Sequence, residues 1–280
     1  MTMTLRTAAL AIAAILSLTA CETNQNPRPD VPEAPQQPAV SSATAAKYGA
    51  LNDNGHQIDA VPMQYLSEDK ARQQVEYWTD QKPGTIIVDP YARYLYHVQP
   101  NDKAMRYAVA VGAAGYGFTG EAHIPYQRDW PRWMPTDNML ADNPDLYGPV
   151  ADGVEGGLDN PLGARALYLH NNRGDTYYRI HGTMDPSSIG QATSAGCIRL
   201  FNQDIIHLAD QTDSMTKVIV LTKAESGKGT VPPGQPLPAA GTAAPTAATP
   251  TNAGAPVSIS GPAATATATP SSSWTEGDNA

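Results

Sequence analysis

Short apolar runs separated by turn residues recur along the chain between residues 84 and 221. Six runs rich in β-branched and aromatic side chains predict strands, at residues 85–88, 94–98, 107–111, 166–169, 177–180 and 217–221. Runs of this length with Gly, Pro, Asn or Asp between them are typical of a mainly β domain. The segment between the first two runs, residues 89–93, indicates a hairpin connection.

Two segments have helical spacing instead. In residues 67–78, the positions of Ala71, Val75 and Trp78 behind a serine cap predict a short amphipathic helix packed on the domain edge. A second helix is expected after residue 201, because Asn202 precedes a group of apolar residues and Asn is a favourable N-cap residue.

Residues 112–163 are rich in Gly, Pro and Trp and show no clear period. Long irregular segments in compact domains tend to be binding loops or covers, so we expect this one to border the functional site. The aromatic side chains of interest in this segment are Tyr116, Trp130, Trp133 and Tyr147. In the plainer interpretation they pack the loop against the sheet, and in the alternative they contact a sugar or a peptide.

Pro, Ala, Thr, Ser and Gln dominate both flanks of the apolar region. Such segments bury too little apolar surface to offset the entropy of ordering the chain. The sequence therefore predicts one folded domain at residues 61–224, with its core at 84–221. We expect a flexible linker at 21–60 and a disordered tail at 225–280.

The first twenty residues have the pattern of a secretory signal peptide. Arg6 precedes an apolar run that is too short to span a bilayer, and small residues lead up to Cys21. This arrangement resembles the bacterial lipobox, which implies cleavage before Cys21 and lipid on its sulfur. The expectation is a membrane-anchored lipoprotein of the periplasm, and Glu22 favours the outer membrane because it is no evident inner-membrane retention signal. An ordinary signal peptide or an uncleaved anchor is the alternative.

The formal net charge is −9, and Lys and Arg do not cluster. Nucleic-acid recognition rests largely on neutralising phosphates, so this charge argues against a nucleic-acid partner. A few local arginines can still bind a carboxylate on an acidic protein.

The chain has two cysteines, Cys21 and Cys197. If Cys21 is lipidated, Cys197 has no second cysteine with which to form a disulfide. An unpaired thiol in an exported protein is either an inert buried group or a reactive one. His181 lies sixteen residues earlier, and an imidazole brought beside a thiol provides the base for a nucleophile. Gly196 leaves room for a substrate carbonyl near the amides of Gly196 and Cys197, which are donors of the kind that stabilise an oxyanion.

The motifs around these residues resemble the signature of the L,D-transpeptidases, the YkuD-type catalytic domain. That signature is written HGT, a spacer, and S-H-G-C-I/V-R/N, and the chain has HGT at 181–183 and SAGCIR at 194–199. Three further elements agree in order, namely an opening hairpin at residues 85–98, W-x-P at 133–135 and N-P-L-G at 160–163. The resemblance covers roughly residues 84–221.

The resemblance implies a β-sandwich of mixed sheets with a few short helices, and acyl transfer on peptidoglycan stem peptides. Cys197 would attack the peptide carbonyl and form a thioester, and His181 would carry protons. The backbone carbonyl of Gly182 would orient the imidazole. No cofactor and no metal are implied. The acyl acceptor would be a stem-peptide amine, giving a 3-3 cross-link, an envelope protein, or water.

One position departs from the family pattern, because Ala195 stands where a second His is common. The departure puts in doubt a secondary role in ordering the loop or holding substrate. Ser194 matches the family pattern and either braces the cysteine loop or is a surface serine. Arg199 is the candidate for binding a stem-peptide carboxylate, and an ion pair with Asp204 is the alternative.

Two other readings remain open. A zinc site of His181, Cys197 and His207 is weak, because zinc ligands usually come in tightly spaced pairs. A catalytically inactive peptidoglycan-binding lipoprotein keeps the fold without the activity. No role is assigned to four other histidines, His97, His123, His170 and His207.

Overall fold

The computed structural model describes residues 40–112, 118–194 and 196–241. The strands are β1 Leu51–Asp53, β2 His56–Ile58, β3 Gln73–Glu76, β4 Ile86–Asp89, β5 Tyr94–Gln99, β6 Lys103–Ala108, β7 Val111–Gly112, β8 Gly120–Ile124, β9 Gln127–Asp129, β10 Arg165–Asn171, β11 Gly174–His181, β12 Ala192–Ser194, β13 Ile198–Arg199 and β14 Thr216–Val220. The α-helices are α1 Ser42–Lys47, α2 Asp137–Asp142, α3 Pro144–Tyr147 and α4 Asn202–Ala209. Single 3-10 turns lie at Met63–Tyr65, Gly148–Val150, Pro186–Ser188 and Lys223–Glu225. None of the helices in these ranges has the length and apolar character needed to cross a membrane.

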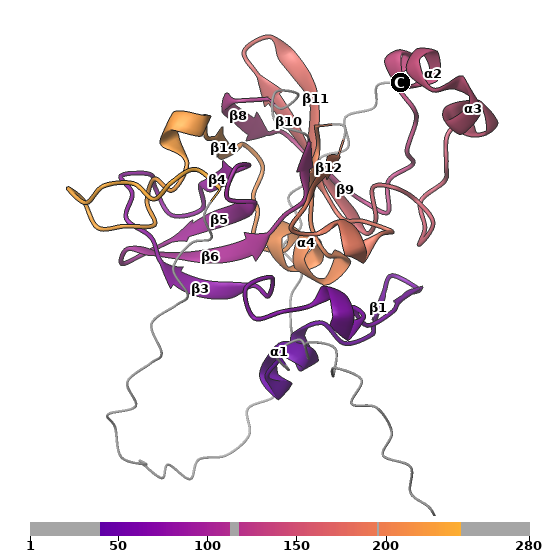
Figure 1. Ribbon diagram of the computed structural model, residues 1–280. Helices are drawn as coiled ribbons and strands as arrows, with labels where there is room; N and C mark the ends of the chain where they lie inside the picture. The colour runs from indigo at the N-terminus through magenta and orange to yellow at the C-terminus, as the bar shows by residue number, and fades with distance from the viewer. Residues whose placement is uncertain (1–39, 113–117, 195, 242–280) are drawn as a thin grey trace, which may run out of the picture. The chain divides into compact units, whose positions relative to one another are not determined.

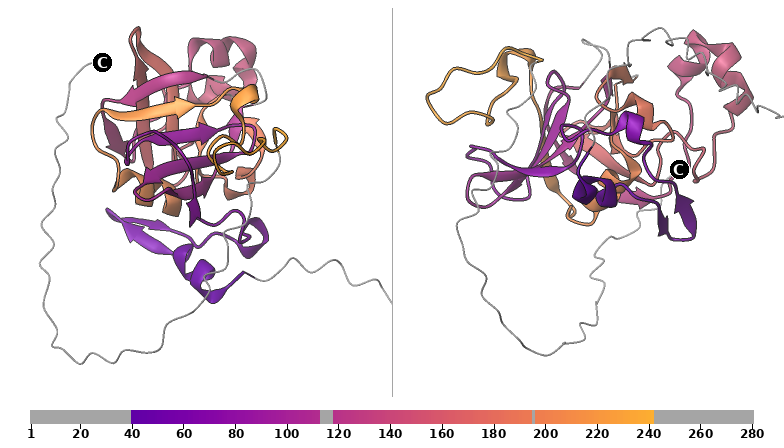
Figure 2. Two further views of the ribbon diagram at one scale, coloured as in Figure 1. Left: turned by 90° about the vertical axis from the view of Figure 1, so that its left-hand side faces the viewer. Right: turned by 60° about the horizontal axis from the view of Figure 1, so that its bottom comes forward.

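Ten of the described strands form one mixed sheet, and the left view of Figure 2 looks onto part of it. The order is β13-β11-β10-β8-β14-β4-β5-β6-β3, with β9 paired to β10. Most neighbours are antiparallel, while β14 runs parallel to β4 and β13 runs parallel to β11. The fold is thus mainly β with a mixed sheet and a few short helices, as the sequence predicts.

The central strands are buried on both faces, which explains their continuous apolar runs. In β4, Ile86 and Val88 belong to one hydrophobic cluster and Ile87 belongs to a second. In β5, Leu95 joins the first cluster while Tyr96 joins the second. The first cluster also holds side chains of β10, β11 and α4, so the two halves of the sheet face each other across it.

The folded part begins earlier than predicted, because residues 40–60 of the expected linker are ordered. They form α1 and the hairpin of β1 and β2, which lie near α4 in Figure 1. The Tyr48 hydroxyl donates to Asp204 Oδ2 at 3.0 Å, and Gln203 Nε2 donates to the carbonyl of Asp59 at 3.0 Å. The prediction of a linker rested on the composition of this segment, and composition does not reveal long-range hydrogen bonds of this kind.

The helix predicted at residues 67–78 is absent, and the strand β3 occupies its second half. Val75 pairs with Ala104 of β6, and the buried side chains of Val75 and Tyr77 alternate with exposed Glu76. This period of two is the strand period. Ala71 and Val75 are both buried, but their helical spacing is coincidental because Ala71 lies in a bend that follows the turn at residues 68–70, just before the strand.

The C-terminal part of the domain also extends beyond the predicted boundary at residue 224. Asp89 Oδ2 accepts hydrogen bonds from the Ser226 hydroxyl at 3.0 Å and from the Gly227 amide at 2.7 Å. The Tyr77 hydroxyl donates to the carbonyl of Lys228 at 2.9 Å. The remainder of the predicted tail, from residue 242, lies outside the described residues.

The region of residues 112–163 contains more regular structure than predicted. β8 and β9 join the main sheet, and α2 and α3 stand on an excursion between β9 and β10, apart from the sheet in Figure 1.

The expected hairpin at residues 89–93 joins β4 to β5, and Asp89 Oδ1 accepts from the amides of Tyr91 at 3.0 Å and Ala92 at 2.9 Å.

Candidate active site

Strand pairing brings His181 and Cys197 onto neighbouring strands. β13 runs parallel to the end of β11, with Ile180 opposite Ile198 and His181 opposite Arg199. Cys197 directly precedes β13 and therefore lies two residues back in register from His181. Residues two apart on a strand face the same side, so the fold places the predicted nucleophile and base at one edge of the sheet.

His181 is buried, and its ring is held by the backbone. Its Nδ1 lies 2.7 Å from the carbonyl oxygen of Gly182, which can only accept, so Nδ1 carries the proton. This is the hydrogen bond that the family resemblance implied. Burial, followed by the positive charges of Arg199 and Arg179, lowers the pKa of His181 to about 3, against the opposing effect of the Gly182 carbonyl. The imidazole is neutral at neutral pH.

Cys197 is partly buried beside the backbone of β11. Its Sγ lies 4.0 Å from the carbonyl oxygen of Tyr177. Burial raises the pKa of the thiol, while the amide of Arg179 and the charges of Arg179 and Arg199 act in the opposite direction. Gly196 is buried and has φ 131°, a conformation that favours glycine directly before the thiol.

Arg199 is half-buried, and its charge acts on both His181 and Cys197. The alternative ion pair with Asp204 does not form, because Arg72 Nη1 occupies that carboxylate at 2.8 Å. The N–H of Arg199 donates to the carbonyl of Ala110 at 2.9 Å, which fixes the backbone of β13 against the residue just before β7. The guanidinium is therefore positioned near the thiol by the sheet.

Arg179 is a residue that the sequence reasoning missed. It lies two positions before His181 on β11, and its guanidinium pairs with Asp175 at 2.7 Å and stacks 4.3 Å from the Tyr168 ring centroid. The sequence could have indicated Arg179, because residues two apart on a strand face the same side and Arg179 lies two positions before His181.

Asn202 was predicted as the N-cap of α4, and this prediction is wrong. The cap position is Phe201, and the Asn202 side chain instead binds two backbone segments. Its Oδ1 accepts from the amides of Ala164 at 3.0 Å and Thr183 at 3.2 Å, and its Nδ2 donates to the Thr183 carbonyl at 2.9 Å. A Cβ on Gly182 would lie 2.2 Å from that Oδ1, so the HGT loop needs glycine there.

The N-P-L-G turn is organised by another asparagine, the buried Asn160. Asn160 Nδ2 donates to the carbonyls of Pro131 at 3.0 Å, Val154 at 2.9 Å and Glu155 at 3.0 Å, and its Oδ1 accepts from the Leu162 amide at 2.8 Å. This one side chain joins the turn to the strand-like bridge of the W-x-P segment. A buried amide with all these partners explains the role of the motif as a brace.

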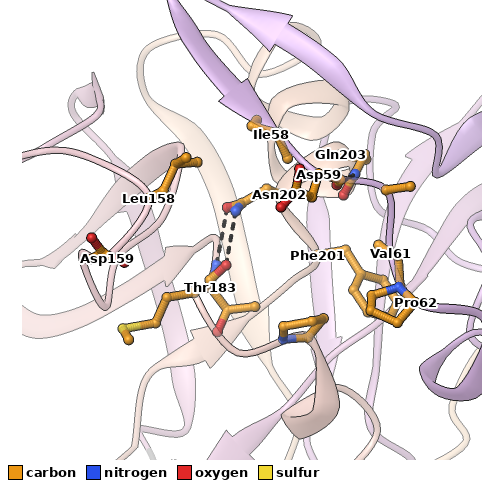
Figure 3. Close-up of a pocket in the computed structure, with 13 residues that line it drawn as sticks. Ile58, Asp59, Val61, Pro62, Leu158, Asp159, Thr183, Phe201, Asn202 and Gln203 are labelled. Carbon is orange, nitrogen blue, oxygen red and sulfur yellow. Dashed lines mark hydrogen bonds between the residues drawn. The ribbon is translucent and has the colours of Figure 1, made fainter.

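Two cavities flank the motifs. One, of about 370 Å³, lies beside the cysteine loop and is lined by Arg93, Val111, Phe118, Tyr178, Gly196 and Ile198 among others. The other, of about 390 Å³, lies beside the HGT loop. Figure 3 shows its wall, in which Thr183 faces Asn202 and residues of the N-terminal segment lie opposite Leu158 and Asp159.

The aromatic residues of the irregular region mainly pack. Trp130 stacks on His56 with 3.9 Å between ring centroids and donates from Nε1 to Asp53 at 2.7 Å. Trp133 and Tyr147 contact each other, with ring centroids 6.2 Å apart. Trp130 also packs against the first hydrophobic cluster, in agreement with the plainer interpretation. The contact between Trp133 and Tyr147 lies within the irregular region and does not distinguish the two interpretations. Tyr116 lies outside the described residues.

The zinc alternative finds no support in the described ranges, where no three His, Cys, Asp or Glu side chains gather as metal ligands. His207 lies instead with its Nδ1 2.8 Å from the Tyr107 hydroxyl. Cys21 and Ala195 lie outside the described residues, and Ser194 is described only by its backbone, which pairs with Gly112 in the two-stranded sheet of β12 and β7.

Comparison with known proteins assigns the domain. Residues 83–220 match the L,D-transpeptidase catalytic domain (YkuD). The "Probable L,D-transpeptidase ErfK/SrfK" of Escherichia coli is 28% identical over 65% of this chain and 55% of its own length. The "Probable L,D-transpeptidase YcfS" of the same organism is 30% identical over 58% of this chain and 48% of its own length. The chain thus spans about half the length of these relatives.

A crystal structure from Brucella melitensis, described as a probable carnitine operon oxidoreductase, is 47% identical over 54% of this chain and 92% of that chain, with a TM-score of 0.38. At this TM-score the likeness assigns neither a fold nor an activity. The motifs, their order and the match over residues 83–220 define the class as a cysteine- and histidine-bearing L,D-transpeptidase domain. Residues 83–220 therefore form a catalytic domain of the L,D-transpeptidase (YkuD) type.

Proposed function

We propose that the protein is an L,D-transpeptidase that acts on peptidoglycan stem peptides through a thioester on Cys197. The observation that carries the proposal is the setting of His181, whose Nδ1 binds the Gly182 carbonyl on the strand beside Cys197. This hydrogen bond leaves Nε2 as the acceptor for the thiol proton. The family match supports the reaction class.

Both reacting groups start neutral in this mechanism, because burial raises the pKa of Cys197 and lowers that of His181. As Sγ attacks the carbonyl carbon of the stem peptide, its proton passes to Nε2 of His181. The resulting tetrahedral oxyanion is stabilised by the amides at Gly196 and Cys197. The C–N bond to the terminal D-alanine then breaks, and the protonated imidazole returns its proton to the leaving amine.

The thioester is resolved by an acceptor amine in the second half of the reaction. The amine nitrogen attacks the thioester carbonyl and loses a proton to Nε2 of His181, and the C–S bond breaks as Cys197 regains the proton. Arg199 is proposed to bind a carboxylate of the stem peptide, since its charge already acts on both reacting groups. The amine of another stem peptide or of an envelope protein is the proposed acceptor, and water would give trimming.

The test is intact-protein mass spectrometry of the full chain after exposure to a stem tetrapeptide or a carbapenem, with Cys197→Ala as the matched control. An adduct on the natural chain and none on the variant supports a cysteine acyl-enzyme. An equal adduct on both chains would remove Cys197 as the nucleophile. No adduct on either chain, with folding intact, would favour an inactive peptidoglycan-binding relative.

The anchoring of the protein is a separate proposal. The signal-like segment ending at Cys21 supports a lipoprotein of the periplasm held by N-terminal lipid, with the outer membrane favoured by Glu22. The Pro-rich residues after Cys21 would then act as a spacer between the membrane and the folded domain.

A further inference from the structure

The peptide unit between Gly182 and Thr183 is hydrogen-bonded on both sides. Its carbonyl oxygen lies 2.7 Å from Nδ1 of His181, and its N–H donates to Oδ1 of Asn202 at 3.2 Å. The chain of bonds runs from the imidazole through one amide to the asparagine. Bonds linked in this way polarise one another, because an amide whose N–H is bound carries more negative charge on its oxygen.

From this arrangement we infer that Asn202 is a positioning residue that acts on His181 through the peptide unit between Gly182 and Thr183. The inference rests on the proposed function, in which His181 is the base. Asn202 itself touches neither the thiol nor the imidazole in the described contacts. Its effect on the reaction is therefore expected to pass through the polarised carbonyl.

The asparagine amide is held rigidly enough for this task. Nδ2 donates to the Thr183 carbonyl at 2.9 Å, so the two hydrogen bonds between Asn202 and Thr183 form the closed pair that Figure 3 shows. Oδ1 also accepts from the Ala164 amide at 3.0 Å. A Cβ on Gly163 would lie 2.3 Å from this oxygen, which shows how closely the two loops pack around it.

The surroundings of His181 make a polarised acceptor useful. Burial and the charges of Arg199 and Arg179 all disfavour the imidazolium, while the Gly182 carbonyl and the Leu162 carbonyl favour it. When the thiol proton arrives, the ring gains a positive charge in this setting. A stronger acceptor at Gly182 stabilises that charge and also holds the tautomer in which Nδ1 carries the proton.

The matched control is the next residue of the same helix. Gln203 is a buried amide that likewise binds backbone groups, and it donates to the carbonyls of Gly49 at 3.3 Å and Asp59 at 3.0 Å. Gln203→Ala removes hydrogen bonds of the same chemical kind without touching the peptide that binds His181. Any loss shared by Gln203→Ala and Asn202→Ala is structural, and any loss confined to Asn202→Ala is not.

The experiment measures single-turnover acylation of Cys197 by a carbapenem on the full-length chain, corrected for the folded fraction, together with the ring ¹⁵N signals of His181. Asn202→Ala is expected to lower the acylation rate constant by about 10- to 100-fold and to mix the two tautomers, while Gln203→Ala changes the rate less than about threefold. Asn202→Asp keeps an acceptor for Thr183 and makes it anionic. The acid limb of its pH–rate profile should move to higher pH, whereas that of Asn202→Ala moves to lower pH.

Two failures are distinguishable. Equal losses in Asn202→Ala and Gln203→Ala, or a shift of the acid limb in the same direction in both Asn202 variants, would overturn the inference and leave the proposed function intact. A His181→Asn chain that acylates at the natural rate would overturn the proposed function, and with it the inference. If Asn202→Ala does not fold, the opposite pH shift expected of Asn202→Asp still decides the matter.

Discussion

Arg165 and Asp53 form a two-point ion pair, with Nη1 2.7 Å from Oδ2 and Nη2 2.8 Å from Oδ1. Asp53 lies in β1, outside the segment that matches the family, whereas Arg165 begins β10. The carbonyl of Arg165 accepts from the amide of Gly182 at 3.1 Å. The N-terminal hairpin is thus connected by two steps to the loop that orients His181.

Breaking this pair should be costly. Both side chains are largely buried, and Asp53→Ala leaves Arg165 with the exposed Asp129 as its remaining ion-pair partner. Unpairing a buried ion typically costs about 3–5 kcal/mol in the free energy of unfolding, so we expect a loss toward the lower end of that range, measured by urea denaturation. The control is Glu121→Ala, which breaks an exposed pair with Lys217 and should cost about 1 kcal/mol or less. Equal losses in the two variants would contradict the prediction.

Arg199→Gln should affect both binding and thiol ionisation. Its charge lowers the pKa of Cys197, so its removal raises that pKa further and slows alkylation by iodoacetamide at a fixed pH below the thiol pKa. The KM for a stem peptide with a free carboxylate should rise by about tenfold, with little change for the amidated peptide. Arg199→Lys serves as the control and should retain most of the natural alkylation rate. If amidation changes KM equally in the natural and Gln chains, Arg199 does not bind that carboxylate.

Asp204 should give the stability a distinctive pH dependence. Burial raises the pKa of this carboxyl from 3.8 to about 6, although Arg72 and Tyr48 both oppose the rise. Between these values the folded state keeps a proton that the unfolded state has released, so the contribution of Asp204 to stability falls as the pH rises. The difference in unfolding free energy between the natural chain and Asp204→Asn should decrease from pH 4 to pH 6 and level off above. A difference that grows over this interval would show that the pKa is lowered.

Cys21→Ser should release the protein from the membrane fraction without changing acylation of Cys197. The lipid would be attached to the Cys21 sulfur, so the substitution removes the proposed attachment to the membrane. Fractionation followed by immunoblotting measures the release. A variant that still sediments with membranes would show that another segment anchors the chain.

The strands that could be predicted from the sequence are those with both faces buried. Ile86, Ile87 and Val88 are consecutive apolar residues because one cluster takes two of them and the other cluster takes the third. β8, β9 and β13 were missed, since β8 and β9 carry exposed polar residues and β13 has only two residues. Their position depends on neighbours far along the chain.

The site was predictable to the extent that its chemistry lies in adjacent residues. His181, Gly182 and Cys197 stand in motifs, and the hydrogen bond from His181 to Gly182 joins neighbours in sequence. Asn202 was placed at the correct helix end, but its side chain had two possible tasks, a helix cap or a backbone clamp. The local sequence favours a helix cap. The fold instead brings the amides of Ala164 and Thr183 to the Asn202 side chain, which therefore binds these two backbone segments.

The segment that matches the family, residues 83–220, is shorter than the segment that forms the folded domain. A fragment cut to residues 83–220 keeps His181 and Cys197. It loses Asp53, Arg72 and the members of the Tyr96 hydrophobic cluster that come from residues 48–77. In such a fragment the buried Asp204 would lack Arg72, Arg165 would keep Asp129 but lose Asp53, and one face of the sheet would be uncovered. Buried charges without partners and exposed apolar surface favour aggregation. The N-terminal segment therefore supplies ion-pair partners and apolar cover to the domain that carries the motifs, although it lies outside the family match.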